Sequence, residues 1–336
     1  REKFSMCAAD FRTACKKAGL ALIVIFAARC VADAVTALVG ALMADCDAQI
    51  TSSVQALANI LILYVLAIAV TSKLLGYRFD GSLYKKPKRL GKAISWFVPM
   101  YGAGQAANIA VMAISFFIVQ NRSAVEDTLA PIISNGLGLG GWYQAFLFVQ
   151  MAVLAPVFEE YWFRGVIQSS LAPYGNGFAI LVSSLCFGMA HGNIHQFCYT
   201  FTVGICLGYV RYATGSLVPT MIMHAIFNSI AGIAIVAVSS ETFISAFTHI
   251  QQGEGLTGGE QAFMTALMIY LAVILTTAVV GIAAAIGKLK NNRLYRPVNN
   301  YPALTKKQKF TAVAKEPLFI VGFILCTAYI IAVMII

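Results

Sequence analysis

The stretch PVFEEYWFRG, residues 156–165, places two adjacent carboxylates and a guanidinium inside a segment that is otherwise apolar from about 145 to 171. A charged side chain near the bilayer centre costs at least about 2.5–3.5 kcal/mol, so such residues are rare and usually functional. The apolar run around the stretch is long enough to cross a membrane. It therefore predicts a transmembrane helix that carries an ionisable site.

The composition of the whole chain indicates a membrane protein. Of its 336 residues, 59% are hydrophobic and only 11% are charged, whereas soluble domains have about 25% charged residues. The eight cysteines follow no disulfide spacing, and we interpret them as reduced packing residues. The net charge of +10 does not require nucleic acid as a partner, because basic cytoplasmic loops give the same sum.

Apolar runs recur along the chain and predict an all-α, polytopic transmembrane helical bundle of about nine spans. We expect N-terminal helices in 1–142, a catalytic core formed by the fourth to seventh spans in 143–238, and C-terminal helices in 239–336. The expected spans are about 20–43, 54–73, 93–119, 143–171, 177–192, 196–212, 216–238, 261–287 and 317–336.

Basic residues gather in the loops 73–92 and 288–315, whereas the alternate loops are poor in lysine and arginine. The alternate loops carry Asp45, Asp47, Arg122, Glu126, Asp127, Glu241, Glu254 and Glu260. This asymmetry follows the positive-inside rule and predicts a cytoplasmic N-terminus and an external C-terminus. Lipid or partner binding is an alternative interpretation of the basic loops.

The spacing within the central stretch separates the two glutamates into roles. On a helix Glu160 and Arg164 share a face, so we expect them to form a supporting ion pair. Glu159 is turned about 100° away and is free to act as a general base. Pro156 frees the carbonyl of Ala152 and allows a kink. The alternative is a buried ion cluster that only fixes helix packing.

Histidines on two later helices extend this set. His191 ends the fifth span, and the following glycine and asparagine predict that His195 lies in a turn. His224 and Asn228 share a face of the seventh span and could together stabilise an oxyanion. Interhelical hydrogen bonding is the alternative for each of them. A zinc site made by Glu159, His191 and His224 is a further alternative, although no His-Glu-x-x-His run supports it.

The ordered set Glu159-Glu160-x-x-x-Arg164, Phe187-x-x-x-His191 and His224-x-x-x-Asn228 resembles the motifs of the CPBP family, the CAAX-protease and bacteriocin-processing intramembrane endopeptidases. The segment from Gly204 to Leu217 is also similar to the family. The resemblance covers about a quarter of the chain, from about 148 to 229.

The resemblance implies peptide-bond hydrolysis by a glutamate-activated water, without a cofactor. Glu159 and His191 would activate the water, His224 and Asn228 would form the oxyanion hole, and Glu160 with Arg164 would support the site. The alternatives are a non-enzymatic membrane scaffold or regulator of the same fold and, third, a transporter; no internal repeat favours the latter.

The resemblance leaves the substrate open among prenylated CAAX tails, bacteriocin leaders and pheromone precursors, with membrane lipids as the surrounding partner. We expect a bacterial plasma membrane, with the endoplasmic reticulum as the alternative. Outside the motifs, Arg29 and Asp33 are four residues apart and are predicted to form a self-neutralising pair. Gly204 and Gly208 predict a close helix contact.

Overall fold

A computed structural model describes residues 2–117, 141–238, 240–290 and 304–335, and these residues form helices and no strand. The helices before the central stretch are α1 (Glu2–Leu42), α2 (Ala48–Ile60), η1 (Leu61–Leu66), α3 (Ala67–Leu75), η2 (Gly81–Tyr84), α4 (Leu90–Ile94) and α5 (Phe97–Phe117). The central rod consists of α7 (Gly141–Val149), η3 (Gln150–Leu154), α8 (Ala155–Glu159), η4 (Glu160–Ile167), α9 (Gln168–Leu171) and η5 (Ala172–Tyr174). The remaining helices are α10 (Asn176–Ala190), α11 (Ile194–Thr214), α12 (Val218–Val238), α13 (Glu241–Gln252), α14 (Gly258–Lys290), α15 (Lys306–Ala314) and α16 (Pro317–Ile335).

The expected polytopic helical bundle is confirmed, and the protein is a multi-pass membrane protein. Five helices are long and apolar enough to cross a membrane, or six if the bent pair α15 and α16 counts as one span. They are Ala9–Leu42, Ala48–Leu75, Tyr143–Tyr174, Val218–Val238 and Gly258–Lys288. The count of nine spans stays a prediction.

The boundaries differ from the expected ones in several places. The first helix already begins at Glu2, and the central rod continues to Tyr174. Two segments that were expected to be loops contain helices, because α13 and α15 are too polar to register as apolar runs. Each begins with a side-chain cap, from Ser240 in α13 and from Thr305 in α15. The predicted external residues Arg122, Glu126 and Asp127 lie outside the described residues.

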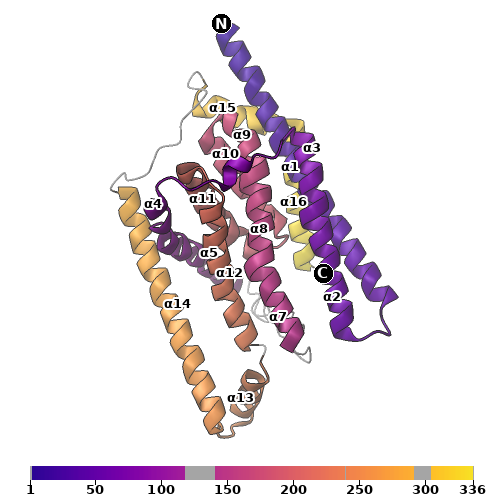
Figure 1. Ribbon diagram of the computed structural model, residues 1–336, viewed down its shortest axis with the longest axis vertical. Coiled ribbons are helices and arrows are strands. Elements are labelled where there is room, and N and C mark those ends of the chain that lie inside the picture. Colours follow the sequence, from indigo (N-terminus) through magenta and orange to yellow (C-terminus); the bar gives the residue numbers. More distant parts are fainter. Residues whose placement is uncertain (1, 118–140, 239, 291–303, 336) are drawn as a thin grey trace.

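Two hydrophobic clusters flank the central rod. One joins α1, α3, η4, α10 and α16 around Trp162, Phe163 and Phe187. The other joins α5, α11, α12 and α14 around Tyr101 and Phe227. In Figure 1, α1 and the α2–α3 rod form one side of the bundle, α14 forms the other, and α8 lies between them. The helix α8, which ends at Glu159, therefore lies between the two clusters.

Small residues set the closest helix crossings. A Cβ atom on Gly19 would come within 2.4 Å of the Leu318 carbonyl carbon, and one on Gly102 within 2.5 Å of the Gly281 carbonyl carbon. The pairs α1–α16 and α5–α14 therefore pack backbone against backbone. The close contact predicted at Gly204 and Gly208 is also present, because α11 approaches Ser184 and Ile180 of α10 there.

Candidate active site

The central rod departs from regular α-helical geometry on both sides of Glu159. Residues 150–154 and 160–167 are π-helical, with five-residue α8 between them. In the π-register of the first segment the carbonyl of Gln150 bonds the N–H of Ala155. The next carbonyl, that of Met151, faces Pro156, which has no N–H. The carbonyl that proline leaves open is thus that of Met151, and the expectation that named Ala152 assumed α-helical spacing.

Asn228 of α12 supplies the missing donor. Its Nδ2 lies 3.0 Å from the Met151 oxygen, so the side-chain amide replaces the lost backbone hydrogen bond. This contact ties α12 to the rod about two turns before the glutamates. The amide has two N–H groups, and Asn228 also lines a cavity beside Glu159. One N–H is therefore structural, and the other is available to a ligand.

Glu160 and Arg164 form the expected ion pair, with Arg164 Nη1 2.9 Å from Glu160 Oε1 and both side chains fully buried. Arg164 Nη2 also donates to the Gly204 carbonyl at 3.2 Å, and the guanidinium lies over the ring of Phe187 at 4.4 Å. The pair consequently joins the rod to α10 and α11.

His224 lies between the two carboxylates. Its Nδ1 is 3.0 Å from Glu160 Oε1, and its Nε2 is 3.7 Å from Glu159 Oε2. A carboxylate accepts only, so the ring donates through Nδ1, and Nε2 can donate as well only when the ring carries both protons. His224 is 3% exposed. It therefore contacts both glutamates from a buried position.

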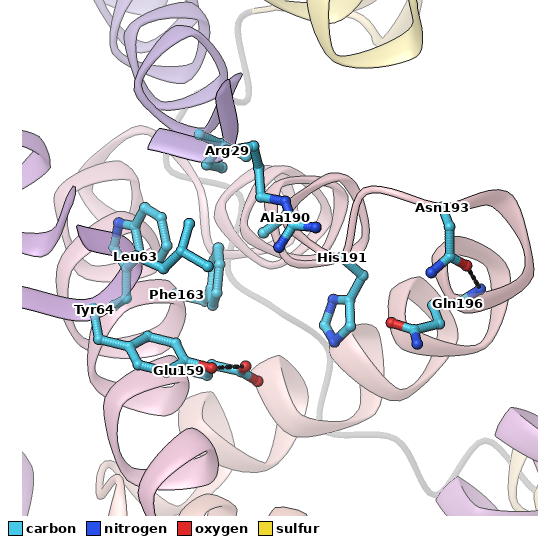
Figure 2. Close-up of a pocket in the computed structure, with 11 residues that line it drawn as sticks. Arg29, Leu63, Tyr64, Glu159, Phe163, Ala190, His191, Asn193 and Gln196 are labelled. Carbon is cyan, nitrogen blue, oxygen red and sulfur yellow. Dashed lines mark hydrogen bonds between the residues drawn. The ribbon is translucent and has the colours of Figure 1, made fainter. Parts of the chain in front are cut away.

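Glu159 differs from its neighbour in access. Its side chain is 12% exposed, whereas that of Glu160 is completely buried. The hydroxyl of Tyr64, from η1, donates to Glu159 Oε1 at 2.8 Å, and the Tyr64 ring stacks on Phe158. Figure 2 shows this hydrogen bond at the edge of a cavity. Glu159 is thus oriented by a side chain and remains accessible from the cavity.

His191 caps the end of α10 and has a defined tautomer. Its Nδ1 is 2.8 Å from the Phe187 carbonyl oxygen, which can only accept, so Nδ1 carries a proton. In the neutral ring Nε2 is then an acceptor. The ring packs edge-on against Phe187. This fixes the orientation of the imidazole in the cavity (Figure 2).

Two cavities meet at Glu159 and His191. The first, of about 330 Å³, is lined by α1, η1 and the rod and includes Arg29 and Tyr64. The second, of about 360 Å³, lies toward α5 and α12 and includes the amides of Gln105, Asn108 and Asn228. Glu159, His191 and Gln196 line both. The two side chains expected to activate water therefore lie between the cavities.

The structure connects four of the six expected residues through Glu160, namely Glu159, Glu160, Arg164 and His224. It places His191 and Asn228 with Glu159 on the walls of the adjoining cavities. His195 is not in a turn as expected. Asn193 caps α11, with Oδ1 accepting from the N–H of Gln196, so His195 lies in the first helical turn.

The expected Arg29–Asp33 pair is not formed. Among the salt bridges of the described residues neither side chain occurs. Asp33 instead accepts a hydrogen bond from Tyr329 of α16, and the Arg29 guanidinium lies 5.8 Å from the Tyr329 ring centre. The spacing of four residues places both side chains on one face, but the Asp33 carboxylate is bonded to Tyr329 of α16 instead.

Sequence reasoning missed Tyr64, Gln196 and Tyr199 as site residues. None of the three belongs to a spaced motif. Their positions beside Glu159 follow only from the packing of η1 and α11 against the rod.

Groups of three or more histidine, cysteine, aspartate and glutamate side chains that could hold a metal ion are absent from the described ranges. Glu159, His191 and His224 thus do not converge on one point. Seven cysteines that the structure describes are free thiols: Cys15, Cys186 and Cys326 are buried as packing residues, whereas Cys30 and Cys46 are exposed.

Comparison with known proteins locates the similarity on the same segment. Residues 141–230 match the family model described as type II CAAX prenyl endopeptidase Rce1-like. No match is found among curated proteins or solved structures. The matched residues include both glutamates, Arg164, His191, His224 and Asn228. The segment that carries the candidate site therefore matches the CAAX-protease family that its motifs resemble.

Proposed function

We propose that the protein is an intramembrane endopeptidase in which Glu159 and His191 activate a water molecule for attack on a peptide bond. The observation that carries this proposal is the shared cavity wall: an accessible carboxylate and an oriented imidazole line the same cavities. Both are held by other side chains or the backbone, as a catalytic pair requires.

The proposed reaction begins when the Glu159 carboxylate accepts a proton from water and the resulting hydroxide attacks the carbonyl carbon of the substrate. The carbonyl electron pair moves to oxygen, and a free N–H of Asn228, with His224, stabilises this oxyanion. The tetrahedral intermediate then collapses. The C–N bond breaks, and the departing amine receives the proton that Glu159 took from water, either directly or relayed through Nε2 of His191.

In this proposal Glu160 and Arg164 act by position. Glu160 holds His224 beside Glu159, and Arg164 attaches the rod to α10 and α11. Because Glu160 has no exposed surface, it does not exchange protons with a water in the cavity.

The substrate is a peptide or protein segment that reaches the site from the membrane. The family description makes a prenylated CAAX peptide the first substrate to test. Bacteriocin and pheromone precursors are the next candidates, and a bacterial plasma membrane is the proposed location, ahead of the endoplasmic reticulum.

The adjacent glutamates provide the decisive test. Glu159→Gln removes the base while keeping shape, so turnover should fall by about 10²–10⁴-fold with the melting temperature nearly unchanged. Glu160→Gln should mainly lower thermal stability, because breaking a buried ion pair costs about 3–5 kcal/mol. Turnover and melting of the purified variants measure both effects.

A matched control is Glu260→Gln, which removes a buried carboxylate bonded to Ser245, outside both cavities. It should leave turnover unchanged. If Glu159→Gln keeps near-normal turnover while Glu160→Gln is folded and inactive, the base is assigned to the wrong glutamate.

Metal dependence gives a second test. If the carboxylate activates water directly, turnover should survive prolonged chelation, and elemental analysis should find no stoichiometric zinc. Activity that is lost on chelation and restored by added zinc would replace the general-base proposal with a site in which Glu159, His191 and His224 rearrange around the metal.

A further inference from the structure

The first cavity contains a cation that lies outside the family-matched segment. Arg29 belongs to α1 and is the only cationic side chain among the described residues that line this cavity. Figure 2 shows its side chain extending from α1 toward Ala190 and His191. The guanidinium lies so close to the end of α10 that a Cβ on Gly192 would be 2.9 Å from its Nη2.

No carboxylate among the described residues forms an ion pair with this charge, and its side-chain hydrogen-bond partner is the neutral hydroxyl of Tyr329. Arg29 makes no salt bridge among the described residues, and Asp33, its nearest acid along the helix, is bonded to Tyr329. The Nε of Arg29 is buried without a hydrogen-bond partner. A buried charged donor is costly when unsatisfied, so an acceptor that enters the cavity gains from this group.

We propose that Arg29 binds a carboxylate of the peptide substrate close to the scissile bond and thereby determines specificity. The inference rests on the proposed function, since the cavity that contains Arg29 is the one that Glu159 and His191 line. A guanidinium matches the two oxygens of a carboxylate with parallel N–H groups. The carboxylate is either the C-terminus of the substrate or an acidic side chain.

The lining of the second cavity supports the placement of the substrate carboxylate at Arg29. Beside the shared carboxylate of Glu159, its polar lining includes the amides of Gln105, Asn108 and Asn228, and no lysine or arginine occurs among its described lining residues. Neutral amides suit the peptide backbone, whereas Arg29 suits an anion. A substrate that crosses Glu159 would thus place its anionic end on the α1 side.

The test compares three prenylated CAAX peptides: one with a free C-terminal carboxylate, one with a C-terminal amide, and one amide with a glutamate as last residue. Wild-type kcat/KM should favour a carboxylate-bearing peptide over the plain amide by about 10- to 100-fold, the effect of one hydrogen bond to a charged group. Whichever acid is preferred identifies the source of the carboxylate.

In Arg29→Met this preference should fall to about onefold, through slower cleavage of the acidic peptide alone. Arg29→Lys should restore part of it. The matched control is Arg12→Met, which removes an exposed arginine from the same helix outside the cavity and should keep the full preference. A ratio of two substrates is independent of the fraction of folded enzyme, so partial misfolding does not obscure the result.

Failure of the proposed function is distinguishable from failure of this inference. If no peptide is cleaved, Kd values of fluorescent versions of the same peptides, measured by anisotropy on the wild type and Arg29→Met, replace the rates. Loss of the acid preference in Arg29→Met supports the inference even then. The inference is overturned if the wild type cleaves or binds the acid and amide peptides equally well, or if Arg29→Met keeps the wild-type preference.

Discussion

At the scale of single residues, the site depends on contacts between segments that are distant in sequence. Glu160 and Arg164 could be paired from their spacing alone, because both lie on one helix. Tyr64 lies 95 residues before Glu159, and no spacing rule connects them. The same applies to Arg29, whose expected partner Asp33 is taken by a tyrosine near the other end of the chain. Motif residues were therefore predictable, whereas their orienting partners were not.

The hydroxyl of Tyr64 provides a prediction at this scale. Tyr64→Phe removes the hydrogen bond that orients the Glu159 carboxylate, so kcat should fall by about 10- to 100-fold, equivalent to about 1.5–3 kcal/mol. KM and the melting temperature should change little, because the ring still stacks on Phe158. Steady-state kinetics on the purified variant measure the effect.

The control for Tyr64 is Tyr270→Phe, which removes a hydroxyl that donates to the Ile230 carbonyl away from both cavities. Its kcat should match that of the wild type. A Tyr64→Phe variant with unchanged kcat would remove this residue from the catalytic arrangement.

At the scale of helices, hydrophobicity predicted the long apolar elements but not the departures from α-helical geometry within them. The polar helices α13 and α15 and the π-helical turns around α8 leave no mark on an apolar pattern. Pro156 indicated an irregularity, but the carbonyl it exposes depends on the π-register and on Asn228 of another helix. Backbone irregularity of this kind is set by tertiary contacts.

The crossing of α5 and α14 gives a prediction at this scale. A Cβ at Gly281 would come within 2.7 Å of Gly102 Cα, so Gly281→Ala should separate the helices and destabilise the protein by about 1–3 kcal/mol. Gly287→Ala, on the same helix with open space around it, should be neutral or stabilising by up to about 1 kcal/mol. The measurement is the melting temperature of each variant in the same detergent. Equal melting temperatures would contradict the packing argument.

At the scale of the molecule, the described basic residues around 76–95 lie beside the end of α14 and the α11–α12 turn. The N–H of Lys88 bonds the Thr214 carbonyl, and that of Leu217 bonds the Leu83 carbonyl, which joins the loop 76–89 to the α11–α12 turn. Lys288 at the end of α14 donates to Ser95 beside α4. In Figure 1 these segments lie in the upper half of the view with the N-terminus above them, whereas α13 lies at the bottom.

This arrangement agrees with the charge asymmetry and predicts a cytoplasmic basic end. An epitope inserted after Lys86 should be reached by antibody only in permeabilised cells, and one after Gly255 should be reached in intact cells. Retained turnover of each insertion variant shows that the tag has not altered the fold. Detection of both epitopes on one side of the membrane would contradict the predicted topology.

The hydrogen bond from Tyr64 to Glu159 has an evolutionary consequence. The matched segment, 141–230, contains the motif but not the tyrosine that bonds the proposed base, Glu159. Grafting this segment between homologous scaffolds would transfer the reactive groups and leave behind an orienting donor. We therefore expect position 64 to covary with the segment 141–230 among relatives, because the donor and the carboxylate it orients lie on different segments.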